Sequence, residues 1–182
     1  QDNALANAKA LLEYGQRLRD YVQGLKTSDL STLTPAQKVA EALAQYQTTL
    51  AAAQGGDQTA LGNLQGVADP YLRLAREFDL PLVLHARRAV DEVIATLRNV
   101  GGVRGVVHSW SGSEEQARQL WKMGFCLGIG GPVTYARAQR LRRLVAAMPV
   151  EYLLLETDAP DQPDAAHRGL RNEPARLPLV AS

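Results

Sequence analysis

The chain has 182 residues, a formal net charge of +1 and 21% charged residues, a size that fits one domain or two small ones with a substantial core. The near-neutral charge excludes a uniformly basic surface for non-specific nucleic-acid binding, but it does not exclude local basic patches. No apolar stretch reaches the roughly 20 residues of a membrane span, and no signal peptide opens the sequence. The single cysteine, Cys126, excludes an intramolecular disulfide and predicts a cytoplasmic location.

Residues 1–70 are predicted to be an all-α segment. Apolar residues recur at helical spacing over residues 3–25, and Thr34-Pro35-Ala36-Gln37 reads as a capping box that starts a second helix. Gly55-Gly56 end that helix, and Asp57 begins a third, which we expect Asp69-Pro70 to kink or restart. The segment carries no chemistry that we can identify, so its expected role is helix packing.

Residues 71–182 alternate between short apolar runs and helical stretches. The predicted strands are 82–85, 105–108, 125–129 and 152–156, and the predicted helices between them are 89–98, 113–123 and 137–147. Four consecutive strand–helix steps predict a parallel sheet, which is half of an eight-stranded barrel. The fold class is therefore α/β: a partial TIM-type (β/α) barrel over 71–182, preceded by the all-α segment.

Three of these strands end on side chains that bind metals. The strands at 82–85, 105–108 and 152–156 lead into His85, His108 and Asp158. Imidazole nitrogen and carboxylate oxygen are ligands of Zn²⁺, Mn²⁺ and similar ions, and parallel strands deliver their carboxyl ends to one rim. The pattern favours a hydrolytic metal site about as strongly as it favours hydrogen-bonded residues without a metal.

The local sequences carry a family resemblance. They are Leu80-Pro81-Leu82-Val83-Leu84-His85-Ala86-Arg87, His108-Ser109-Trp110-Ser111-Gly112-Ser113, Gly128-Ile129-Gly130-Gly131-Pro132-Val133-Thr134, Leu153-Leu154-Leu155-Glu156-Thr157-Asp158-Ala159-Pro160 and Arg168-Gly169-Leu170-Arg171-Asn172-Glu173-Pro174. Together they resemble the TatD family of metal-dependent hydrolases, in its YjjV-like branch, over about residues 71–182. The resemblance implies a TIM barrel that hydrolyses phosphodiesters, with DNA as the best-known substrate, at a centre of two divalent ions (Mg²⁺, Mn²⁺ or Zn²⁺).

The resemblance also implies roles for individual residues. His85 and His108 match metal ligands, Asp158 matches a ligand that also activates water as the catalytic base, and Glu156 matches a partner that orients the site. Asn172 and Glu173 are expected to anchor a loop. Arg87 and Ser111, which follow the strand ends, are candidates for contact with a phosphate group, although exposed arginines are more often simply solvated.

Two features of the family pattern are absent from the sequence. The family opens with a His-x-His pair and later supplies a bridging glutamate, yet the first histidine here is His85. We therefore expect a truncated or fused chain, whose open sheet edges favour a homo-oligomer. Residues 31–72 weakly resemble helical segments of phage tail tape-measure proteins. A structural protein with an inactive barrel remnant is thus the alternative to the hydrolase, and an amidohydrolase-like enzyme acting on a small molecule is a third possibility.

Overall fold

A computed structural model describes the backbone of residues 2–181 and the side chains of residues 5–181. The chain divides into two compact units, Gln1–Leu74 and Ala75–Ser182, which are treated separately below. None of the helices in the described part is both long and apolar enough to cross a membrane.

The first unit is helical, as predicted. It contains α1 (Asp2–Thr27), α2 (Pro35–Gln54) and most of α3 (Gln58–Glu77). The predicted capping box is confirmed: the Thr34 side chain accepts from the Gln37 N–H, and the Gln37 side chain accepts from the Thr34 N–H. Lys26 forms an ion pair of 2.9 Å with Glu41, which joins the end of α1 to α2.

Of the kink or restart predicted at Asp69-Pro70, the restart is wrong, because α3 continues through Pro70 to Glu77. Proline removes one helical hydrogen bond, but Leu72, Leu74 and Ala75 just beyond it are buried. Their packing offsets the loss and keeps the helix in one piece. The apolar residues predicted to line one face of α1, by contrast, are exposed; they include Leu5, Leu11, Leu12, Leu18 and Val22.

The second unit is a four-stranded parallel sheet in the order β1-β2-β3-β4. Its strands are β1 (Leu82–His85), β2 (Gly105–His108), β3 (Phe125–Ile129) and β4 (Leu153–Leu155). The first three have the predicted bounds. The predicted α/β class and parallel sheet are confirmed. Within the described residues the sheet stays open and does not close into a barrel.

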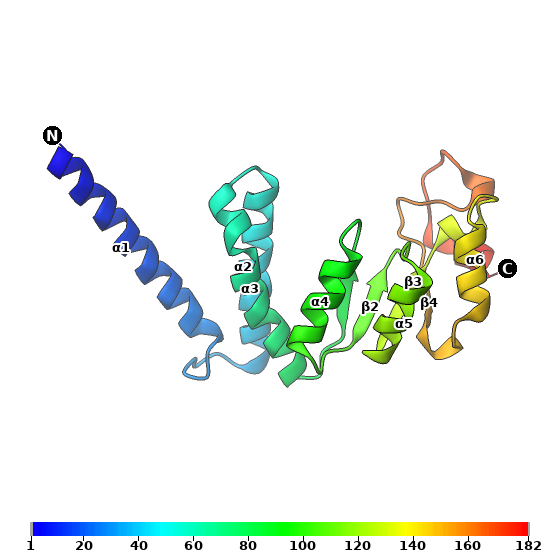
Figure 1. The fold of residues 1–182 in the computed structure, drawn as a ribbon, viewed down its shortest axis with the longest axis horizontal. Coiled ribbons are helices and arrows are strands. Elements are labelled where there is room, and N and C mark those ends of the chain that lie inside the picture. Colours follow the sequence, from blue (N-terminus) through cyan, green and yellow to red (C-terminus); the bar gives the residue numbers. More distant parts are fainter. Residues whose placement is uncertain (1, 182) are drawn as a thin grey trace. The chain divides into compact units, whose positions relative to one another are not determined.

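One face of this sheet is covered by helices. They are α4 (Val90–Val100) and α5 (Glu114–Lys122), which Figure 1 shows in front of the strands, while the third helix, α6 (Gln139–Ala147), lies between β3 and β4 in the chain. Ile94, Leu97 and Leu120 from the helices are buried together with Val107 and Leu127 from the strands. Strand residues point alternately to the two faces, so Val83, on the other face, is 76% exposed.

Short elements complete the unit. They are the 3₁₀ helices η1 (Gly131–Thr134), η2 (Val150–Tyr152), η3 (Ala165–His167) and η4 (Pro174–Arg176), and the terminal helix α7 (Leu177–Ala181). The helix η2 leads into the amino end of β4, and the others follow β3 or β4 in the chain. The irregular chain from 156 to 173 runs between β4 and η4 and includes η3. This stretch carries the acidic residues predicted to form the site.

Candidate metal centre

The two predicted histidine ligands stand side by side. His85 and His108 are register partners at the ends of β1 and β2, and their ring centroids are 5.5 Å apart at an interplanar angle of 37°. The sheet pairing sets this spacing, because both residues occupy the last position of neighbouring parallel strands. His85 is exposed, whereas the His108 side chain is only 22% exposed.

Glu156, the residue expected to orient the site, contacts His108. One carboxylate oxygen, Oε2, is 3.0 Å from His108 Nδ1, and the other, Oε1, accepts the backbone N–H of Ser109 at 2.5 Å. The carboxylate lies against Gly128, where any Cβ atom would overlap it. The bond to Nδ1 orients the ring and leaves Nε2 on its opposite side.

Asp158 lies at that opposite side. Its Oδ1 is 3.2 Å from His108 Nε2, and its φ of 53° is in the left-handed region, as is that of Ser109 at 55°. Non-glycine residues in this region are uncommon and concentrate at functional sites. At each of these strand ends, therefore, the chain turns sharply beside the candidate ligands.

The donor pair fits a metal ion in its chemistry and spacing. Two ligands at bond lengths of about 2.0–2.2 Å from a tetrahedral ion are roughly 3.3–3.5 Å apart, close to the 3.2 Å between His108 Nε2 and Asp158 Oδ1. Nowhere in residues 2–181, however, do three or more His, Cys, Asp or Glu side chains form a group that could hold a metal ion. His85 lies beside the pair rather than converging with it.

Gln162 is a member of this network that the sequence did not single out. Its side-chain N–H groups donate to Ser109 Oγ at 2.5 Å and to Asp158 Oδ2. A glutamine in a polar loop has no spacing signal, and only the folded chain brings it to residues 109 and 158.

A cleft of about 1000 Å³ opens over these residues. Its lining includes His85, His108 and Asp158 together with Arg87 and Ser111, the predicted phosphate contacts. Further lining residues are Tyr135, Arg137 and Arg140, and the Arg137 guanidinium lies 5.7 Å from the centre of the Tyr135 ring. The cleft thus combines metal-type ligands with positive charge. A smaller hollow of about 560 Å³ beside α4 and α5 is lined by Arg98 and Lys122 but by no His, Asp or Glu.

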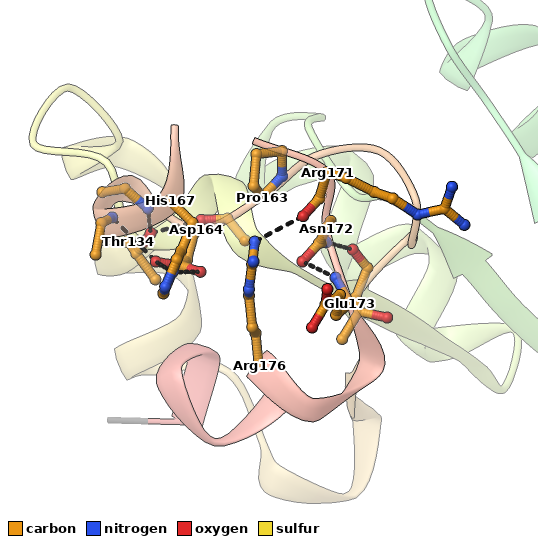
Figure 2. Close-up of polar contacts among 12 residues, drawn as sticks. Thr134, Pro163, Asp164, His167, Arg171, Asn172, Glu173 and Arg176 are labelled. Atoms are coloured by element: carbon orange, nitrogen blue, oxygen red, sulfur yellow. Dashed lines mark hydrogen bonds and ion pairs between the residues drawn. The ribbon is translucent and has the colours of Figure 1, made fainter. Parts of the chain in front are cut away.

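Asn172 anchors the loop that carries Asp158, as expected. Only 3% exposed, it donates through Nδ2 to the carbonyls of Thr157 at 2.5 Å, Asp161 at 2.7 Å and Gln162 at 3.2 Å. Its Oδ1 accepts the N–H of Glu173, and Figure 2 shows Asn172 beside Glu173 in this cluster.

A second buried polar group lies in the same cluster. It is Asp164, which is only 3% exposed, and its Oδ2 lies 2.8 Å from Nδ1 of His167, whose side chain is 34% exposed (Figure 2). Burial alone would raise the pKa of the Asp164 carboxyl. The hydrogen bonds from His167 and from the N–H of Ala166 outweigh burial and hold that pKa below its ordinary value.

Comparison with known proteins assigns the family. Residues 63–182 match the family described as TatD related DNase. The metal-dependent hydrolase YjjV of Escherichia coli K12 is 42% identical over 126 residues, which are 69% of this chain and 49% of that protein. YabD of Bacillus subtilis, also called a metal-dependent hydrolase, is 40% identical over 112 residues, 60% of this chain and 44% of that protein. The chain belongs to the TatD family.

The solved structures agree with the sequence comparison. The crystal structure of YjjV, a TatD homologue from Escherichia coli K12, matches with a TM-score of 0.61 and 38% identity, over 68% of this chain and 48% of that one. The chain therefore spans about half the length of the relatives it matches. The predicted TatD resemblance is confirmed, and it begins at residue 63 rather than about 71. The resemblance of the helical segment to tail proteins finds no support, and the structural-protein alternative is not favoured.

Proposed function

We propose that this chain forms part of a metal-dependent phosphodiesterase site of the TatD type, acting on DNA. The observation that carries the proposal is the pair of donor atoms, His108 Nε2 and Asp158 Oδ1, 3.2 Å apart at the rim of a positively lined cleft. The relatives named as metal-dependent hydrolases support the same chemistry.

The proposed roles follow from the contacts. His108 and Asp158 would hold a divalent ion (Mg²⁺, Mn²⁺ or Zn²⁺), and His85, the third proposed ligand, would join them only by turning its ring toward the pair. A complete centre of this type would hold two such ions. The ion, when bound, lowers the pKa of a coordinated water so that hydroxide is available near neutral pH. Glu156 keeps the His108 ring turned with Nε2 toward Asp158, and Asp158 takes the proton from the attacking water.

The positive lining is the proposed binding surface for the substrate. Arg87 and Ser111 lie on the cleft wall with His85 and His108, where a phosphate group could be reached by a guanidinium and a hydroxyl. A small neutral ester would gain nothing from the positive charge of the Arg87 guanidinium. A preference for oligonucleotides over small esters therefore separates the nuclease from an amidohydrolase-like enzyme.

The test is Mn²⁺-dependent cleavage of a single-stranded DNA oligonucleotide. Asp158→Asn removes the proposed ligand and base, and Asp69→Asn makes the same chemical change at an exposed position of α3. We expect cleavage by the unaltered chain and by Asp69→Asn, and a loss of at least about 100-fold in Asp158→Asn. Equal cleavage by all three proteins, or none from folded protein, would refute the proposal for this chain.

A further inference from the structure

The amide of Gln162 joins two loops that leave different strands. It donates to Ser109 Oγ at 2.5 Å, in the loop after β2, and to Asp158 Oδ2, in the loop after β4. An amide nitrogen carries two hydrogens, so each can serve one of these acceptors. The side chain is half-buried and lies in the wall of the cleft.

This bridge divides the two oxygens of Asp158 between two partners. Gln162 holds Oδ2, while Oδ1 is 3.2 Å from His108 Nε2. Turning the Asp158 carboxylate away from His108 would break the bond to Gln162. The amide therefore keeps one defined oxygen of Asp158 directed at the histidine.

The backbone of Gln162 is itself fixed by neighbouring residues. Its φ of 48° is left-handed, and its carbonyl accepts from the buried Asn172. That carbonyl also occupies the space that a Cβ atom on Gly131 would need. Because the loop is fixed at these points, the amide has a fixed base from which to hold Asp158.

We propose that Gln162 is a positioning residue that sets the placement of Asp158 relative to His108; this inference rests on the proposed metal-dependent function. A neutral amide suits the task, because it orients the carboxylate without cancelling its charge. A lysine or arginine at this position would repel a bound cation.

The first test needs no metal and no activity. In nuclear magnetic resonance spectra of the metal-free protein, the Gln162 side-chain amide protons should show cross-relaxation with Ser109 protons. Gln162→Met should shift or broaden the backbone amide signals of Ser109 and Asp158. Gln119→Met, at a glutamine of α5 that bonds Arg98, should leave those two signals unchanged. Unmoved signals in Gln162→Met would overturn the inference.

The second test measures Mn²⁺ affinity by calorimetry or electron paramagnetic resonance. We expect binding about 10–100-fold weaker in Gln162→Met and unchanged in Gln119→Met. Wild-type affinity in Gln162→Met would overturn the positioning role. If the unaltered chain binds no Mn²⁺, the proposed metal site fails, and the metal-free spectra still decide whether Gln162 places Asp158.

Discussion

Gly128→Ala tests the packing of Glu156, because the methyl group would occupy the space of its carboxylate. An ideal Cβ at Gly128 lies 2.6 Å from Glu156 Cδ and 2.8 Å from Oε1, closer than real Cβ contacts allow. Glu156 can swing away, but it then loses its bonds to His108 and to the Ser109 N–H. Hydrogen bonds to a charged group are worth about 1.5–3 kcal/mol each, and the Glu156 side chain is only 14% exposed. We expect a destabilisation of about 2–4 kcal/mol.

Urea unfolding followed by tryptophan fluorescence measures this change in the second unit, which contains both tryptophans, Trp110 and Trp121. For a slope of about 2 kcal/mol per molar urea, the midpoint should fall by about 1–2 M. Gly130→Ala is the matched control, because its Cβ would come no closer than 3.3 Å to Glu156 O. Its cost should stay below about 1 kcal/mol.

A double-mutant cycle isolates the cause. With Glu156→Ala in place, the added methyl group at Gly128 has no carboxylate to displace, so Gly128→Ala should cost less than about 1 kcal/mol. An equal cost in both backgrounds would refute the reasoning, as would a midpoint for Gly128→Ala that equals that of Gly130→Ala.

Three further changes probe the surroundings of the site. Asn172→Leu leaves the carbonyls that Asn172 serves without their donor and should lower the free energy of unfolding by about 2–4 kcal/mol; a loss under about 0.5 kcal/mol in urea unfolding would contradict the anchoring role. Asp164 has a lowered pKa in the folded chain, so its stabilising effect is full above its ordinary pKa near 3.8 and is lost as the pH falls through the lowered value. Asp164→Asn should therefore flatten that part of the acid-unfolding profile, and an unchanged profile would contradict this assignment. Val83→Lys, at a side chain 76% exposed, should change the free energy of unfolding by no more than about 0.5 kcal/mol; a larger loss would show that this face is covered.

The sequence predicted the bounds of those strands that are marked by residues next to them in the chain. The strands 82–85, 105–108 and 125–129 are confirmed because each is a short run rich in apolar residues beside glycine, proline or a polar strand end. The fourth is shorter than predicted, ending at Leu155, although the Glu156 N–H still donates to Ile129 O. The restart at Pro70 fails because packing beyond the proline outweighs a local penalty.

The sequence predicted which residue types belong to the site, but it did not predict most of their contacts. Strand register brings His85 beside His108, and that much follows from two equivalent strand ends. The contact of Glu156 over Gly128 does not, because only the packed sheet places the Glu156 carboxylate where a side chain at Gly128 would stand. Gln162 could not be found at all, since its partners are 53 residues away and 4 residues away in the chain.

The most direct test of the metal centre is anomalous diffraction from crystals of this chain soaked in Mn²⁺. The account predicts an anomalous peak within bonding distance of both His108 Nε2 and Asp158 Oδ1, and its absence in Asp158→Asn. A peak elsewhere, a peak that persists in Asp158→Asn, or no peak beside His108 would contradict the assignment of these residues as the ligands.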